Sequence, residues 1–212
     1  MMKILKDLVA GIQAGILIAI GGSVFLACYG DGSLINRTIG AVFFSVALLC
    51  ICYKGYSLFT GKVGYIPEKH DANAFSVLLL GLLGNAIATI LIGLALREAI
   101  PAFAGPAELI CTAKLTQAWW QTLVRGIFCG VLMYLAVSVY RDKSSISAIF
   151  FCVPVFILAG FEHSIANMFY FGAAGMVNLE SVLYLAIVVV GNSIGGMLLP
   201  LLAMIGEPRK SA

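Results

Sequence analysis

Long apolar runs, separated by short polar segments, occupy almost the whole chain. A helix of about 20 mostly apolar residues is long enough to cross a bilayer. Six such runs can be read, at 8–29, 39–66, 74–97, 118–140, 146–172 and 181–205. Hydrophobic residues make up 61% of the 212 and charged residues only 11%, whereas soluble domains average about 25% charged residues. The sequence therefore predicts an all-α membrane protein with six transmembrane helices and a single membrane domain over 1–212.

The basic residues favour one orientation in the membrane. If both termini are cytoplasmic, that side carries Lys3, Lys6, Lys69, Arg141, Lys143, Arg209 and Lys210, and the opposite side carries Arg37, Arg97, Lys114 and Arg125. Cytoplasmic loops hold an excess of Lys and Arg, so we expect a multi-pass protein with both termini in the cytoplasm. The net charge of +3 is too small to predict a nucleic-acid partner, and the expected surroundings are the lipid bilayer.

Motifs for catalysis or metal binding do not stand out. The sequence has no HExxH pair and no glycine-rich phosphate loop after a strand. Its six cysteines form no CxxC pair, which argues against a metal site or a disulfide framework. We therefore expect no enzyme activity, no cofactor and no bound metal.

Two of the apolar runs are interrupted by polar residues and glycines. The second run continues into "KGYSLFTGKVG" (54–64), and the fifth is broken by "GFEH" (160–163). Non-helical backbone at membrane depth is tolerated only where it is buried in protein or lines a cavity. Interrupted segments at corresponding places in two halves of a transporter indicate its substrate pathway.

The two halves of the chain share a second motif. "GNAIAT" (84–89) is echoed by "GNSIGG" (191–196), and each follows its interrupted run. Three spans per half is an odd number, so the halves must have opposite orientations in the membrane. We therefore expect an inverted 3+3 repeat, with halves of about 1–98 and 110–206. When the two halves are superposed, Thr60 is expected to match His163, and Asn85 to match Asn192.

At these motifs the chain resembles the formate–nitrite transporter family. The resemblance covers about the whole chain, and "LFTGKV" (58–63), "RGIFC" (125–129), "GFEHSIANMF" (160–169) and "GNSIGG" (191–196) carry it. It implies a homopentamer of aquaporin-like protomers in the inner membrane of a bacterium or archaeon, with helices two and five broken at mid-membrane. It also implies a channel or transporter for small monovalent weak-acid anions such as formate, nitrite, hydrosulfide or short carboxylates.

The resemblance assigns apolar and polar positions to the pore. The family's outer constriction corresponds to Phe44 and Phe156, and its inner one to Leu48 and Leu58. Its polar positions correspond to the central histidine His163, preceded by Glu162, the facing threonine Thr60 and the vestibule lysine Lys114. The family's usual asparagine sixteen positions after that lysine is Gly130 here, which would remove one polar pore contact.

The chemistry of the polar residues near the breaks suggests a role for each of them. Ionisable groups at membrane depth usually mark a pathway or a relay, so we place His163 and the nearby Asn167 in the substrate pathway. Adjacent helical side chains diverge, so Glu162 is expected to point away from His163 and to hold the break. Lys62 either meets the substrate or snorkels to the cytoplasmic surface.

A mechanism follows as a hypothesis. The constrictions formed by the Phe and Leu side chains should block charged species, since moving an ion into an apolar site costs several kcal/mol. Lys114 and the positive ends of the half-helices would attract the anion, and His163, oriented by Thr60, would supply or relay a proton. Two alternatives remain: a pore for small neutral solutes, although paired Asn-Pro-Ala breaks are absent, and a non-transporting membrane subunit.

Overall fold

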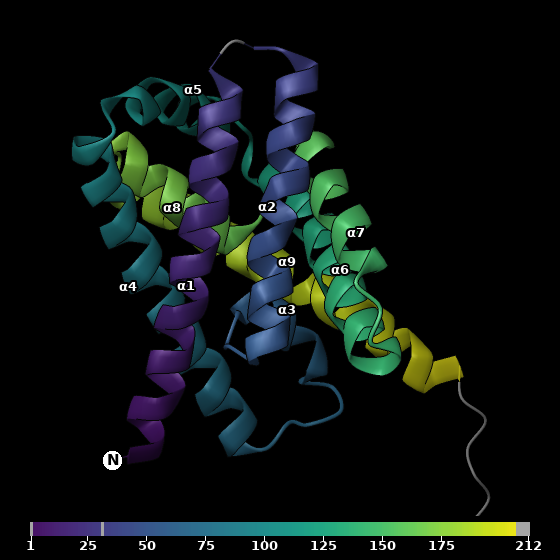
Figure 1. Ribbon diagram of the computed structural model, residues 1–212. Helices are drawn as coiled ribbons and strands as arrows, with labels where there is room; N and C mark the ends of the chain where they lie inside the picture. The colour runs from purple at the N-terminus through teal and green to yellow at the C-terminus, as the bar shows by residue number, and fades with distance from the viewer. Residues whose placement is uncertain (1, 31, 207–212) are drawn as a thin grey trace, which may run out of the picture.

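The computed structural model describes residues 2–30 and 32–206, and these residues form helices joined by short loops, with no strand among them (Figure 1). The helices are α1 (Met2–Tyr29), α2 (Leu34–Lys54), α3 (Phe59–Lys62), η1 (Val63–Tyr65), α4 (Ala72–Ala99), η2 (Pro101–Phe103), α5 (Ala104–Leu115), α6 (Trp119–Lys143), α7 (Ser147–Leu158), α8 (Ser164–Ala174) and α9 (Leu179–Gly206). The all-α prediction is confirmed. Arg209 and Lys210, used above to argue orientation, lie outside the described residues.

Among the described residues, five helices are long and apolar enough to cross a membrane: α1, α2, α4, α6 and α9. The apolar helix α7 has only 12 residues, because the fifth apolar run is divided between α7 and α8. The second run likewise begins earlier than 39, since Ser33 caps α2 by accepting a hydrogen bond from the amide of Asn36. The chain is therefore a multi-pass membrane protein.

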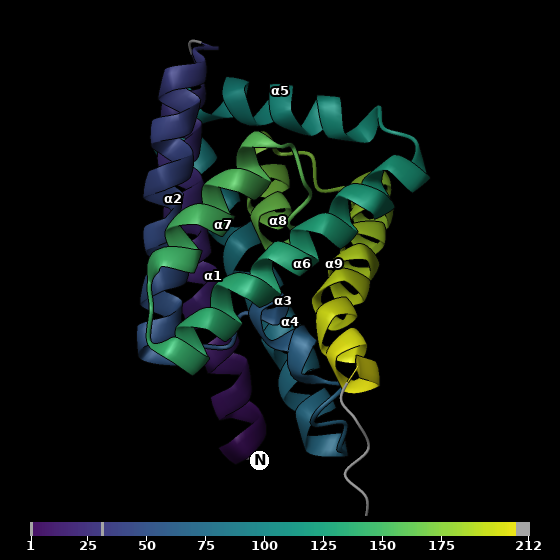
Figure 2. The same cartoon turned by 90° about the vertical axis from the view of Figure 1, so that its right-hand side faces the viewer.

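A polar stretch between the halves, 101–117, is helical. It forms η2 and α5, and α5 lies crosswise over one end of the bundle (Figure 2), where it packs on α8. The N-terminus lies at the opposite end (Figure 1). Lys114 is therefore a helical residue whose side chain is only 15% exposed.

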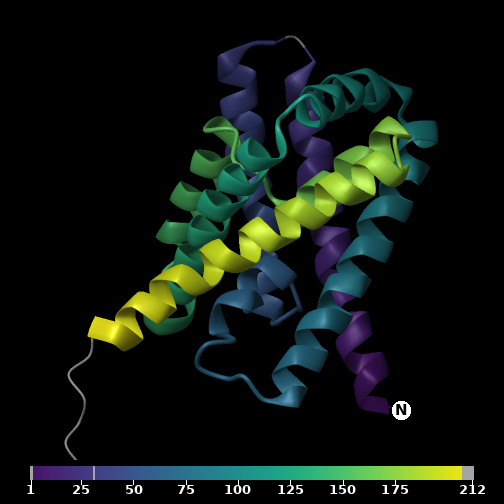
Figure 3. The same ribbon diagram turned by 180° about the vertical axis from the view of Figure 1, so that it is seen from behind.

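Glycines let two pairs of helices approach at backbone distance. Helix α9 runs the length of the molecule with α6 alongside (Figure 3), and α1 packs on α4 in the same way. A Cβ atom on Gly11 would lie 2.6 Å from the carbonyl oxygen of Gly81, and one on Gly195 would lie 1.8 Å from that of Ile127. Small residues at helix contacts are typical of membrane bundles.

Gly130 belongs to this packing and not to a pore lining. A Cβ atom at Gly130 would lie 2.3 Å from the carbonyl oxygen of Asn192 and 2.8 Å from the amide nitrogen of Gly196. A side chain here would push α6 away from α9. The expectation that Gly130 marks a lost polar pore contact is therefore wrong, because this position faces the backbone of a neighbouring helix.

Candidate functional site

The two interrupted runs leave helical geometry at glycines. Helix α2 ends before Gly55 and α7 ends just before Ala159 and Gly160, and both glycines adopt the left-handed conformation, with φ of 67° and 71°. The amide of Tyr56 then donates to the carbonyl of Ile51, and that of Phe161 to Phe156. These are Schellman-type ends, which favour glycine because it has no Cβ atom.

One buried asparagine holds the chain after each of the two breaks, Asn85 at the first and Asn192 at the second. The amide oxygen of Asn85 accepts a hydrogen bond from the backbone N–H of Phe59 at 2.9 Å, and its nitrogen donates to the carbonyls of Ser57 and Gly11 at 2.9 and 2.8 Å. The side chain thus caps α3 from a neighbouring helix, which matters because Leu58 provides no side-chain cap.

Asn192 makes the matching bonds in the second half. Its oxygen accepts from the backbone N–H of Ser164 at 2.9 Å, and its nitrogen donates to the carbonyls of Glu162 and Gly126 at 2.7 and 2.9 Å. The two asparagines satisfy backbone groups that would otherwise be buried without partners.

The bonding register corrects one expected pairing. Ser57 and Phe59 occupy the places that Glu162 and Ser164 occupy in the other half. The residue equivalent to His163 is therefore Leu58, and each is the N-cap of its short helix. The prediction that Thr60 and His163 are equivalent positions is wrong.

Thr60 and His163 instead contact each other directly. Thr60 Oγ1 lies 2.9 Å from His163 Nε2, and both residues are buried. His163 Nδ1 accepts the backbone N–H of Ala166 at 3.1 Å. A neutral imidazole has one donor and one acceptor nitrogen. Because Nδ1 is the acceptor, Nε2 carries the proton, and its N–H donates a hydrogen bond to the threonine oxygen.

Apolar rings surround this hydrogen bond. The rings of Phe156 and His163 stack with centroids 5.4 Å apart, and Phe44 meets Phe156 edge-on at 6.4 Å. Leu48 and Leu58 are both 1% exposed. The Phe156 ring thus packs on the histidine of a buried polar contact, Phe44 packs on Phe156, and Leu48 and Leu58 are buried as well.

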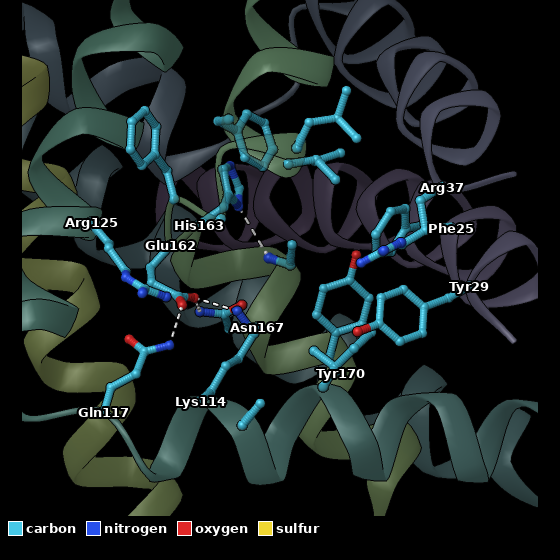
Figure 4. Close-up of a pocket in the computed structure, with 18 of the residues that line it drawn as sticks. Phe25, Tyr29, Arg37, Lys114, Gln117, Arg125, Glu162, His163, Asn167 and Tyr170 are labelled. Carbon is cyan, nitrogen blue, oxygen red and sulfur yellow. Dashed lines mark hydrogen bonds and ion pairs between the residues drawn. The ribbon is translucent and has the colours of Figure 1, made fainter. Parts of the chain in front are cut away.

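A second polar cluster surrounds the Glu162 carboxylate (Figure 4). Its oxygens accept from Lys114 Nζ, from Gln117 Nε2 at 3.1 Å and from Asn167 Nδ2 at 2.9 Å. Glu162 is 1% exposed, and three donors suit an ionised carboxylate, which only accepts hydrogen bonds. Because the bonds join α5 to α8, the cluster ties the crosswise helix to the second break.

Two cavities approach the Thr60–His163 contact from opposite ends. The α5-side cavity has a volume of about 650 Å³ and is lined by Arg37, Lys114, Phe156, Glu162, His163 and Asn167, among others. The η1-side cavity has a volume of about 770 Å³, and Leu48, Leu58, Lys62, Tyr65 and Arg141 are in its lining. Phe156 and His163 therefore line the α5-side cavity and Leu48 and Leu58 line the η1-side cavity, whereas Thr60 and Phe44 are in neither lining.

The sequence analysis missed several residues of the α5-side cavity. Tyr29, Arg37, Gln117, Arg125 and Tyr170 all contribute to its lining. They come from four helices and the turn after α5, and no spacing links them in the sequence. Arg125 belongs to the "RGIFC" motif quoted above, whereas Arg37 precedes the predicted second run, which begins at 39, and offered no signal beyond its charge. Within the described residues, no group of three or more His, Cys, Asp or Glu side chains is placed to hold a metal ion.

A multi-pass helical protein with two cavities facing a buried polar contact belongs to the class of membrane transport proteins. A family model described as "Formate/nitrite transporter" matches residues 1–206, and this chain belongs to that family. It is 29% identical over 177 residues to "Formate channel FocB" of Escherichia coli (strain K12), with 74% of this chain and 62% of that protein covered.

Solved structures share the fold. An "FNT family ion channel" superposes with a TM-score of 0.84 at 22% sequence identity, covering 96% of this chain and 91% of that one. A "Pentameric formate channel with formate bound" gives a TM-score of 0.78 at 23% identity, covering 96% and 97%. The matched proteins are channels and transporters, in keeping with the expectation that this chain is not an enzyme.

Proposed function

We propose that this protein moves small monovalent weak acids, with formate as the first candidate, through a pore between the two cavities. The observation that carries the proposal is the buried Thr60–His163 contact, whose histidine lines one cavity while Leu58, two residues before Thr60, lines the other. The family, and the similarity to a formate channel, support an anion substrate. Nitrite, hydrosulfide and short carboxylates are further candidates.

The pathway passes two apolar constrictions. Phe44 and Phe156 form the one nearer α5, and Leu48 and Leu58 form the one nearer η1. An ion at either constriction loses its bound water without gaining a hydrogen-bond or ion-pair partner, at a cost of several kcal/mol. The substrate therefore crosses them as the neutral acid, and the proton must be gained inside the protein or at its mouth.

His163 is the proposed point of proton exchange. Its Nε2–H is directed at Thr60, while Nδ1 is occupied by the amide of Ala166. If Nε2 gives its proton to the substrate, the ring must take up another from water in a cavity, and a proton that arrives at Nδ1 breaks the bond to Ala166. Proton relay is therefore coupled to a local change at the start of α8, and Thr60 is the residue that orients the ring.

The remaining pathway residues have supporting roles in this proposal. Glu162 and Asn167 hold Lys114 and the second break in place. Lys62 lines the η1-side cavity and attracts anions there, with no carboxylate bonded to it among the described residues.

The assembly and its orientation complete the proposal. We propose a homopentamer in the cytoplasmic membrane of a bacterium or archaeon, because the chain resembles a pentameric formate channel. Each protomer is one membrane domain with six spans, the second and fifth broken at mid-membrane, in an aquaporin-like inverted repeat of about 1–98 and 110–206. Both termini are cytoplasmic, so the α5-side cavity opens outward.

The test is uptake into liposomes that contain the purified protein and an internal pH dye. Formate should enter faster as the external pH falls, with acidification of the interior, since one proton must be supplied through His163 for each anion that crosses. A panel of nitrite, hydrosulfide, lactate and glycerol then ranks substrates. Rapid glycerol flux that ignores pH would favour the neutral-solute pore instead, and no flux of any compound would favour a non-transporting subunit.

The constriction assignment makes a separate prediction. Replacing Leu48 and Leu58 together with alanine removes six heavy atoms from the end of the η1-side cavity, which should raise formate flux by roughly threefold or more and admit lactate. Buried Leu→Ala changes cost about 2–5 kcal/mol each, so flux is measured per folded pentamer after size-exclusion chromatography. Leu83→Ala is the matched control, because that side chain is 50% exposed on α4. A double variant with the parent's flux and size limit would show that the barrier lies elsewhere.

A further inference from the structure

The cationic side chains that line the α5-side cavity differ in how much of their charge is neutralised by a carboxylate. Three cationic side chains, Arg37, Lys114 and Arg125, share the lining with one carboxylate, Glu162. Lys114 is hydrogen-bonded and ion-paired with Glu162, so this pair is close to neutral as seen from the cavity. The excess positive charge of the mouth therefore comes from the two arginines.

Arg37 is held in place by an aromatic cluster on the opposite side of the cavity from Lys114 and Glu162 (Figure 4). Its guanidinium carbon lies 5.6 Å from the centre of the Tyr29 ring. The Phe25 ring in turn lies 5.6 Å from Tyr29 and 6.1 Å from Tyr170. A guanidinium stacked on an aromatic face keeps its planar fork of N–H donors in a fixed orientation.

The donors of Arg37 are only partly used inside the protein. Its NH2 group donates to the carbonyl of Gly32 at 3.2 Å, and its buried Nε has no partner. The ion pairs between described residues do not include Arg37. Arg37 also lines the cavity, so the terminal N–H groups of its guanidinium that make no bond to a described residue can serve a ligand there.

The position of Arg37 opposes two general preferences. It lies in the first turn of α2, where the helix dipole disfavours a cation. It also lies on the side of the membrane where basic residues are depleted, in the orientation proposed above. A residue that breaks local preferences, and that has no ion pair with another described residue, is expected at a functional site.

We propose that Arg37 is the residue that recognises the anion at the outward mouth, with Tyr170 beside it, and that it selects planar oxyanions. A guanidinium binds the two oxygens of a carboxylate or nitrite with parallel N–H bonds, whereas hydrosulfide offers one atom. Formate and nitrite are therefore concentrated at this wall before they reach Phe156 and His163. This inference rests on the proposed function and names its substrate class.

The experiment compares Arg37→Gln and Arg37→Lys with the parent in liposomes, over a range of formate and hydrosulfide concentrations. Arg37→Gln should raise the half-saturating formate concentration about fivefold, with the maximal rate within about twofold, since an exposed charge-assisted contact is worth a modest factor. Arg37→Lys keeps the charge but loses the fork, so it should raise the half-saturation for formate by about threefold and leave that for hydrosulfide within about 1.5-fold.

Arg97→Gln is the matched control. Arg97 is another guanidinium toward the same end of the protein, but it pairs with Glu108 and donates to the carbonyl of Ala173 without lining the cavity. Its loss should lower the melting temperature and leave half-saturation unchanged. Tyr170→Phe gives a second reading if Arg37→Gln folds poorly, since it removes only the hydroxyl and should raise the formate half-saturation by about twofold.

The outcomes separate the two levels of the proposal. A parent protein with no saturable formate uptake overturns the proposed function. Saturable uptake with the same half-saturation in parent and Arg37→Gln overturns the role of Arg37 alone. Equal changes for formate and hydrosulfide in Arg37→Lys overturn the selection of planar oxyanions.

Discussion

His163→Asn should reduce proton-coupled formate uptake by roughly tenfold or more while the protein remains folded. The side-chain oxygen of asparagine can take the place of His163 Nδ1 and accept the amide of Ala166, and asparagine is a favoured N-cap residue. It is too short to replace Nε2, so the contact with Thr60 at 2.9 Å is lost. The variant therefore removes proton exchange and keeps the start of α8.

His163→Gln is the matched variant, because it keeps the contact with Thr60 and loses the cap on Ala166. Its terminal nitrogen can reach Thr60 and donate a hydrogen bond, but the cap on Ala166 is lost. If His163 exchanges protons, neither variant restores pH-dependent uptake. If His163 serves only as a hydrogen-bond donor to the substrate, the glutamine variant keeps much of the flux.

The measurement is uptake into liposomes at several pH values, together with size-exclusion chromatography and thermal melting of the same preparations. Uptake by His163→Asn that matches the parent and still acidifies the interior would overturn the proton-exchange mechanism. A strong loss of melting temperature with normal uptake per folded protomer would assign His163 to packing.

Asn192→Ala should destabilise the fold by about 3 kcal/mol or more. Three backbone groups at the second break, the amide of Ser164 and the carbonyls of Glu162 and Gly126, would lose their partner. An unsatisfied buried polar group costs about 1–3 kcal/mol, and at membrane depth no bulk water replaces the lost bond.

Asn85→Ala is expected to have a similar effect, because Asn85 makes the corresponding three bonds at the first break. Asn178→Ala is the control, since its side chain accepts only the amide of Ser181 at the start of α9 and should cost about 1 kcal/mol. Melting of the purified proteins in one detergent ranks the three variants. An Asn192→Ala protein as stable as the parent would show that the asparagines do not hold the breaks.

Local sequence determined the helices and their interruptions. Apolar runs of membrane-spanning length leave the backbone no alternative to helix in a bilayer, and glycine at 55 and 160 permits the left-handed turn that ends α2 and α7. The repeated Gly-Asn motif identified Asn85 and Asn192 as structural equivalents, and their matching bonds agree with that expectation. The contact between Thr60 and His163 came from the family resemblance.

Only the tertiary structure decided which side chains meet. Lys114 and Glu162 are 48 positions apart, and their pairing depends on α5 folding across the end of the bundle, which its composition alone did not predict. Gly130 was read as a missing pore contact because the sequence does not state which face of α6 meets α9. The register of the repeat, with Leu58 in the place of His163, and the excess charge from Arg37 and Arg125 are likewise results of packing, because hydrogen-bond partners and cavity walls are set by helices distant in the chain.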